Sequence, residues 1–238
     1  MENSLLGSFF DILFPPVCLL CANSLRDGPL CKACASGLDG KRISAPVCTV
    51  CGTPFPQGNG GGHTCGQCIK GLPPFVMARS AYSYGSVVLD AVHRLKYGND
   101  TALSVPLGRI MADFACVAFP IRPDIVIPVP LHEKRLRERG YNQSLLLARE
   151  VARHMRAGLD YTGLIRVRET KPQTALKSGE RTDNVGKAFA LTAPSIFNGK
   201  RTLLIDDVFT TGATVRECAK ALKKAGAEVY VLTLARAC

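Results

Sequence analysis

Residues 201–214 read RTLLIDDVFTTGAT, an apolar run that ends in two adjacent carboxylates and is followed by a turn of small residues. The run is too short for a helix and is typical of a buried strand. The turn can present backbone N–H groups and hydroxyls to an anion, and Gly212 permits close approach of the backbone. Apolar residues then recur at helical spacing: Val215, Cys218, Ala219 and Leu222. The sequence therefore predicts a strand, a phosphate-binding turn, and a helix whose N-terminus faces the turn.

The carboxylate pair, Asp206 and Asp207, favours a second kind of ligand group, because its charge would repel a phosphate. Neighbouring carboxylates can accept hydrogen bonds from the hydroxyls of a ribose, or hold a divalent cation. A sugar phosphate satisfies both halves of the stretch. A generic strand, turn and helix with a solvated Asp pair is the alternative interpretation.

The stretch resembles the binding signature of type I phosphoribosyltransferases: four apolar residues, two acids and a Thr-Thr-Gly-x-Thr loop. The resemblance implies that Asp206 and Asp207 hold the ribose hydroxyls of phosphoribosyl pyrophosphate and are the catalytic residues. It also implies that the 5′-phosphate is held by the turn residues Thr210, Thr211, Gly212, Ala213 and Thr214.

Length and charge divide the chain unequally. Its 238 residues are enough for one ordinary domain and a small module. Residues 1–75 have a net charge of +1, whereas residues 76–238 have +10 of the total of +11. A basic surface of this kind favours phosphate-rich partners, although moderate positive charge also serves solubility.

Cysteine usage indicates a metal module in the first part. Two cysteines two residues apart can bind one tetrahedral ion, and two such pairs complete a structural zinc site. Sequential pairing would give a double zinc ribbon, although cross-braced pairing and an iron–sulfur cluster stay open as alternatives. Eight of the eleven cysteines form four Cys-x-x-Cys pairs: Cys18/Cys21, Cys31/Cys34, Cys48/Cys51 and Cys65/Cys68.

The N-terminus predicts a short amphipathic helix docked on the chain's own core. Its apolar face is interrupted by Asp11 and by Pro15-Pro16. No basic segment precedes it, so we expect neither a signal peptide nor stable membrane insertion, and a cytoplasmic protein. Pro73-Pro74 indicates a linker, which gives a double zinc ribbon with its helix at 1–75 and an α/β domain at 76–238.

In the second part, strand and helix patterns alternate. The predicted strands cover about 78–84, 124–128, 201–207 and 228–235, and the predicted helices about 87–98, 102–118, 145–155 and 215–225. Cys116 is predicted to be a buried core thiol. The alternation predicts an α/β fold with a mostly parallel, Rossmann-like sheet and helices on both faces.

A basic loop is predicted after the strand at 124–128, where open α/β sheets bind ligands. Its charged residues include Lys134, Arg135, Arg137 and Arg139. Arg135 and Arg139 are four residues apart and could share one face of a helical turn, with Arg137 pointing elsewhere. Solvated surface arginines are the alternative interpretation.

This segment resembles the ComF family, which includes the competence protein ComFC and the GntX-like proteins. The matching run is Pro128-Val129-Pro130, Arg135 and Arg139-Gly140-Tyr141-Asn142-Gln143, and the downstream matches are Arg168, Lys171, Gln173, Arg181, Asn184 and Phe189. The zinc segment, the helix end at Lys96-Tyr97 and the acid pair match too, so the similarity covers most of the chain.

The resemblance implies a phosphoribosyltransferase-type fold that binds phosphoribosyl pyrophosphate with Mg²⁺. Arg135, Arg139 and Lys171 would lie in the ligand site, and residues 168–181 would form a mobile flap. Thr210 stands where hypoxanthine–guanine enzymes have an Asp, which argues against a hypoxanthine-type acceptor.

Two functions follow from the resemblance. The first is an enzyme that transfers the phosphoribosyl group to an unidentified nucleophile. The second is a non-catalytic protein that senses the metabolite and contacts single-stranded DNA or proteins of the competence machinery. Both imply a role in the uptake or use of external DNA.

Overall fold

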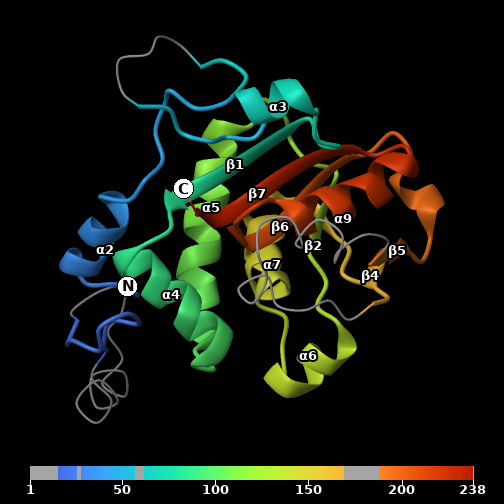
Figure 1. Cartoon of the computed structure of the whole chain (residues 1–238). Coiled ribbons are helices and arrows are strands. Elements are labelled where there is room, and N and C mark those ends of the chain that lie inside the picture. Colours follow the sequence, from blue (N-terminus) through green and yellow to red (C-terminus); the bar gives the residue numbers. More distant parts are fainter. Residues whose placement is uncertain (1–15, 26–27, 57–61, 169–187, 238) are drawn as a thin grey trace.

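A parallel sheet forms the centre of the computed structural model, which describes residues 16–25, 28–56, 62–168 and 188–237 (Figure 1). Among these residues the sheet has five strands, in the order β1-β7-β6-β2-β3, and every neighbouring pair is parallel. The strands are β1 (Met77–Ser83), β2 (Ile125–Pro128), β3 (Gly158–Leu159), β6 (Arg201–Phe209) and β7 (Glu228–Arg236). The predicted α/β fold with a parallel sheet is confirmed.

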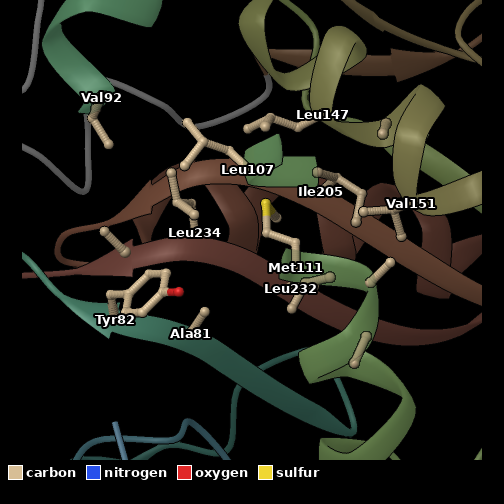
Figure 2. Packing of buried hydrophobic residues seen from close by; sticks show 14 of the residues in the cluster. Ala81, Tyr82, Val92, Leu107, Met111, Leu147, Val151, Ile205, Leu232 and Leu234 are labelled. Carbon is tan, nitrogen blue, oxygen red and sulfur yellow. The ribbon is translucent and has the colours of Figure 1, made fainter. Parts of the chain in front are cut away.

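Helices cover both faces of this sheet, which agrees with the burial of four successive β6 residues, Thr202 to Ile205. On one face, Ile205 packs with α5 (Ser104–Ala118) and α7 (Gln143–Met155) in a cluster that Figure 2 shows. On the other face, Leu204 packs with α9 (Ala213–Lys224). Because both faces are covered, β6 and β7 are continuous apolar runs rather than alternating ones. The predicted strand is extended to Phe209, beyond the acid pair.

Smaller elements complete the described chain. The zinc-ribbon segment contains α2 (Lys32–Asp39) and α3 (Gly66–Lys70), and α4 (Ser86–Tyr97) contacts α2. The remaining elements are η1 (Thr101–Leu103), α6 (Glu133–Arg139), η3 (Pro194–Phe197) and the antiparallel pair β4 (Leu164–Arg166) and β5 (Phe189–Leu191). The predicted N-terminal helix, Lys171 and most of the predicted flap lie outside the described residues.

The segment Thr101–Ala118 is long and apolar enough to cross a membrane by length and composition, with a mean hydropathy of 1.3, and 44% of it is buried inside the protein. Its Leu107 and Met111 lie in the core against α7. The prediction for Cys116 is wrong: its thiol is exposed. Cys116 lies seven residues after the exposed Arg109, so it falls on the outer face of α5.

The zinc-ribbon segment is joined directly to the edge strand β1. Ser83 N–H donates to the carbonyl of Lys41 at 2.8 Å, and Ala78 N–H donates to the carbonyl of Val50 at 2.7 Å. Gly52 has a φ of 73°, and a Cβ there would lie 2.6 Å from the Ala78 carbonyl oxygen. These contacts cover the edge that β1 would otherwise expose. A boundary at residue 75 stays a prediction.

Candidate functional site

The acid pair lies near the carboxyl end of the central strand β6. Ser144 Oγ donates to Asp206 Oδ1 at 3.0 Å, and the N–H of Asp207 donates to the same oxygen at 3.0 Å. Ser144 is placed by Asn142, the N-cap of α7, whose side chain accepts the Ser144 N–H and donates to the Val129 carbonyl at 3.0 Å. The start of α7 is therefore fixed against the acid pair.

Asp207 is buried, with 3% of its surface exposed. Its Oδ1 forms an ion pair with Lys96 Nζ at 2.9 Å. Burial lowers the pKa of Lys96, but the charge of Asp207, the hydrogen bond to it and the charge of Asp206 together outweigh burial and raise that pKa. Asp207 Oδ2 is buried without a hydrogen-bond partner among the described residues. An oxygen of this kind fits a ligand hydroxyl or a divalent cation, because buried acceptors are rarely left unpaired.

Asp206 has a strongly raised pKa. Burial and the charge of Asp207 raise its pKa to about 7, although Lys96 and Ser144 act in the opposite direction. Near neutral pH the pair therefore shares less than two full negative charges. A ligand that donates hydrogen bonds or brings positive charge would stabilise the fully ionised pair.

The turn after β6 is formed as the sequence predicts. Gly212 is the N-cap of α9 with a φ of 76°, and a Cβ there would lie 2.5 Å from the Phe209 ring. A cavity of about 20 Å³ opens against the turn. Its lining brings Asp206 and the turn together: Asp206, Val208, Phe209, Thr210, Gly212, Ala213, Thr214 and Val215. The predicted phosphate turn and Asp206 are thus neighbours.

A larger cavity of about 650 Å³ lies beside Lys96. Its lining is polar and mostly basic or aromatic: Lys96, Tyr97, Asn99, Arg135, Glu138, Arg139 and Tyr141. The guanidinium of Arg139 lies 5.1 Å from the ring centroid of Tyr97, and Tyr141 Oη donates to the Leu95 carbonyl at 2.8 Å. Lys96 links this cavity to Asp207, so the two predicted halves of the site are connected.

The predicted basic loop is wrong in its local structure, because residues 133–139 form the helix α6. Glu133 in its first turn and Arg137 and Arg139 in its last turn complement the helix dipole. Arg135 and Arg139 line the cavity. Arg137 instead faces solvent and pairs with Glu133 at 3.7 Å, with 78% of its side chain exposed.

Lys96 and Ser144 are absent from the site residues predicted from the sequence. Lys96 stands out only as part of a helix end, and Ser144 only as the start of a helical pattern. Both approach the acid pair because of the strand order of the sheet, which no local spacing encodes. The weak sequence signal for the ion pair with Asp207 is a lysine at a predicted helix end in a chain that also contains an acid pair.

The eight predicted zinc ligands lie in two groups, Cys18/Cys21/Cys31/Cys34 and Cys48/Cys51/Cys65/Cys68, and in each group the sulfur atoms lie within 4.8 Å of one another. Sequential pairing is therefore confirmed. Cys21 and Cys31 sulfurs are 3.6 Å apart, and those of Cys51 and Cys65 are 3.7 Å apart. Zn–S bonds of about 2.3 Å in a tetrahedron require sulfur separations of roughly 3.8 Å, so both groups fit Zn²⁺.

Backbone donors favour thiolates in these groups. Burial raises the pKa of Cys48, but N–H groups of Cys65, Cys51 and Val50 lower it to about 6. Cys18 in the first group has its pKa lowered to about 6 in the same way, where backbone N–H groups outweigh burial. His63 is a loop residue stacked on Phe55, with ring centroids 4.1 Å apart. The two groups fit structural zinc sites.

Comparison with known proteins gives two family matches. Residues 9–69 match the family described as double zinc ribbon domain, and residues 142–237 match the family described as phosphoribosyl transferase domain. Among solved structures, the chain is similar to a glutamine phosphoribosylpyrophosphate amidotransferase from B. subtilis. That likeness has 19% identity, covers 60% of this chain and 30% of the other, and has a TM-score of 0.42, which adds no support to the sequence matches.

Three curated relatives cover nearly the whole chain. DNA utilization protein YhgH of Salmonella typhi is 32% identical, over 90% of this chain and 93% of its own length. Competence protein F of Haemophilus influenzae is 30% identical, over 92% and 96%. Competence protein ComFC of Bacillus subtilis is 29% identical, over 92% and 95%. The chain therefore belongs to the ComF family, the family of these competence and DNA utilization proteins.

Proposed function

We propose that this chain binds phosphoribosyl pyrophosphate with Mg²⁺ and acts in the uptake or use of external DNA. The observation that carries the first part is Asp207 Oδ2, which is buried and has no hydrogen-bond partner among the described residues, while the adjacent Asp206 lines the cavity at the turn before α9. The second part rests on the names of the relatives, which are competence and DNA utilization proteins. The excess of basic residues after residue 75 favours a nucleic-acid or phosphate-rich partner.

The parts of this ligand fit successive parts of the site. The ribose hydroxyls donate to Asp206 and Asp207, and the 5′-phosphate lies against the N–H groups of residues 210–214. The pyrophosphate occupies the 650 Å³ cavity, where Arg135 and Arg139 supply positive charge. Mg²⁺, when bound, neutralises pyrophosphate charge, and Asp207 Oδ2 is its candidate protein ligand.

Transfer would form a bond between the acceptor nucleophile and the anomeric carbon and break the bond between that carbon and the pyrophosphate oxygen, so that pyrophosphate leaves. Positive charge then develops on the sugar and negative charge on the leaving group. Asp206 and Asp207 hold the ribose in place, while Lys96, Arg135 and Arg139 stabilise the departing pyrophosphate. The same site could instead sense the metabolite without turnover, and in both cases we propose a cytoplasmic protein whose partners are single-stranded DNA and the competence machinery.

Calorimetry with phosphoribosyl pyrophosphate and Mg²⁺ tests the binding proposal. Asp206→Asn and Asp207→Asn should each weaken binding about tenfold or more, because the amide replaces one acceptor oxygen by an NH₂ donor and removes the negative charge. Asp113→Asn is the matched control, since Asp113 is exposed and pairs with His154 away from the acid pair. Unchanged affinity in two folded acid-pair variants would contradict the assignment.

A pyrophosphate-release assay then separates the two modes of action. Release that depends on a candidate nucleophile indicates transfer. Tight binding without release indicates a sensor.

A further inference from the structure

One buried arginine lies between the second zinc ribbon, which contains Cys48, Cys51, Cys65 and Cys68, and the turn that joins β6 to α9. Arg236 ends β7 and is 7% exposed. Its Nη1 donates to the Cys51 carbonyl at 2.9 Å, and its Nη2 donates to Thr53 Oγ1 at 2.7 Å and lies 3.8 Å from Cys51 Sγ. The guanidinium therefore holds both the backbone and the sulfur of a predicted zinc ligand. Contacts of this kind fix the orientation of metal ligands.

The same guanidinium reaches the phosphate turn through an aromatic ring. It lies 4.2 Å from the ring centroid of Phe209, the last residue of β6. The Cζ atom of the same ring lies 2.5 Å from where a Cβ of Gly212 would be, so the ring also lies against the backbone of Gly212. The contacts thus run from Cys51 through Arg236 and Phe209 to Gly212, the N-cap of α9.

Around this series of contacts the ribbon and the turn are separated by a cavity of about 790 Å³. Thr53 and Lys70 line it from the ribbon, and Thr210 and Thr211 line it from the turn. The two segments also share buried contacts, since Cys51 and Cys68 lie in one hydrophobic cluster with Phe209 and Val215. The contact through Arg236 and Phe209 adds a polar connection from the ribbon backbone to the ring that lies against Gly212.

We propose that Arg236 is a positioning residue that couples zinc occupancy of the second ribbon to the geometry of the phosphate turn. Zinc fixes the turn that contains Cys48, Cys51 and Thr53. The Arg236 guanidinium then has two fixed acceptors, the Cys51 carbonyl and Thr53 Oγ1. The guanidinium then fixes the Phe209 ring, and the ring sets the backbone at Gly212. A turn held in this way is preorganised for its anion, which strengthens binding. This inference rests on the proposed function.

Arg79 provides a matched control. It also holds the second ribbon, since it donates to the carbonyls of Thr49 at 3.1 Å and Cys48 at 3.4 Å. Arg79 lies on the edge strand β1, however, and its guanidinium donates to carbonyls of the ribbon and of its own strand. Loss of Arg79 should therefore loosen the ribbon without releasing the turn.

The first test compares Arg236→Ala, Arg236→Lys, Phe209→Leu and Arg79→Ala as zinc-loaded full-length proteins. We expect Arg236→Ala and Phe209→Leu to weaken calorimetric binding of phosphoribosyl pyrophosphate about fivefold to tenfold, and to speed amide hydrogen exchange at residues 210–214. Arg236→Lys keeps the charge but loses the paired donors of the guanidinium. Its affinity and exchange rate should therefore lie between those of Arg236→Ala and the wild type. Arg79→Ala should change both readouts by less than about twofold, a size typical of additive, uncoupled sites.

The second test uses the reciprocity of coupled binding. If zinc strengthens ligand binding, then the ligand must slow zinc release to a chelator in the wild type, and this effect should be lost in Phe209→Leu. Equal effects of Arg236→Ala and Arg79→Ala, or wild-type exchange of residues 210–214 in Arg236→Ala, would overturn the inference. If the wild type fails to bind the ligand, the proposed function fails, while the exchange measurement still decides the coupling.

Discussion

The two adjacent carboxylates of β6 have different environments, and the difference assigns them different roles. Asp207 is buried and pairs with Lys96 through Oδ1, and its Oδ2 has no hydrogen-bond partner among the described residues. Asp206 is hydrogen-bonded to Ser144 and has a pKa raised to about 7, chiefly by burial. Asp206 is therefore the residue whose charge changes near neutral pH.

We predict that affinity for phosphoribosyl pyrophosphate rises between pH 6 and pH 8 and that Asp206→Asn removes the part of this rise that belongs to the protein. The pKa of Asp206 is raised from 3.8 to about 7, so its acceptor form is gained as pH rises through about 7. Because the folded state holds this proton more tightly than the unfolded state, the contribution of Asp206 to the unfolding free energy decreases as the pH rises from about 4 to about 7. Calorimetry at pH 6, 7 and 8 checks this, and an identical slope in both proteins would contradict it.

At the scale of elements, the short helix α6 separates its basic residues by face. Arg135 and Arg139 are one helical turn apart and line the large cavity, whereas Arg137 pairs with Glu133 in solvent. This division agrees with the face assignment made from spacing, although the segment is a helix rather than a loop.

We predict that Arg135→Ala and Arg139→Ala weaken binding of pyrophosphate and of phosphoribosyl pyrophosphate, each by about tenfold, because a charge-assisted contact to phosphate is lost. Arg137→Ala, on the same helix, should leave both affinities nearly unchanged. Salt titrations with single-stranded DNA check the other use of these residues, since each lost phosphate contact lowers the slope by about 0.7. Loss of small-ligand binding in Arg137→Ala alone would refute this division.

The strands β2 and β6 are joined at their amino ends by Asp124 and Arg201. Asp124 Oδ2 accepts the Arg201 N–H at 2.8 Å, and Oδ1 accepts from its guanidinium at 3.0 Å. Hydrogen bonds from the Arg201 side chain and backbone lower the pKa of Asp124 to about 2. This contribution to stability is present above the ordinary pKa of 3.8 and is lost as pH falls towards 2.

We predict that Asp124→Asn modestly lowers the denaturation midpoint and that the decrease is the same from pH 5 to pH 8. Both the folded and the ordinary pKa of Asp124 lie below that window, so its charge does not change within it. Ligand affinity should be unchanged, because the pair lies at the end of β6 opposite the acid pair. A decrease that varies across this window would show that another group is responsible.

At the scale of the whole molecule, the second ribbon is part of the core rather than an appendage. Cys48, Cys51 and Cys68 lie in one buried cluster with residues of β6, β7 and α9. In Figure 1 the ribbon segment runs along the outer side of β1. Loss of this metal site should therefore destabilise the sheet as well as the ribbon.

We predict two zinc ions per chain, and about one after Cys48→Ser, because metal binding supplies the folding energy of each ribbon. Cys48 is fully buried and Cys21 is exposed, so Cys48→Ser should lower the melting temperature more than Cys21→Ser does. Metal analysis of protein purified without added zinc, with thermal melts of both variants, checks these outcomes. One zinc per wild-type chain would remove one of the two sites.

The sequence by itself determined the features whose partners are close along the chain. The run at 201–214 encodes strand, turn and helix through its spacing, and it contains the acid pair. The Cys-x-x-Cys pairs encode the metal ligands for the same reason, since each pair occupies one tight turn. Local periodicity also gave the helix end at Lys96, although not the role of that residue.

Tertiary structure decided every feature that joins distant segments. The order β1-β7-β6-β2-β3 brings the end of α4 to β6, which pairs Lys96 with Asp207. It also places Arg236 between Cys51 of the second zinc ribbon and Phe209. The exposure of Cys116 and the sequential pairing of the Cys-x-x-Cys pairs also depend on tertiary contacts. These contacts depend on how strands are ordered and helices are packed, and residue spacing carries no record of that order.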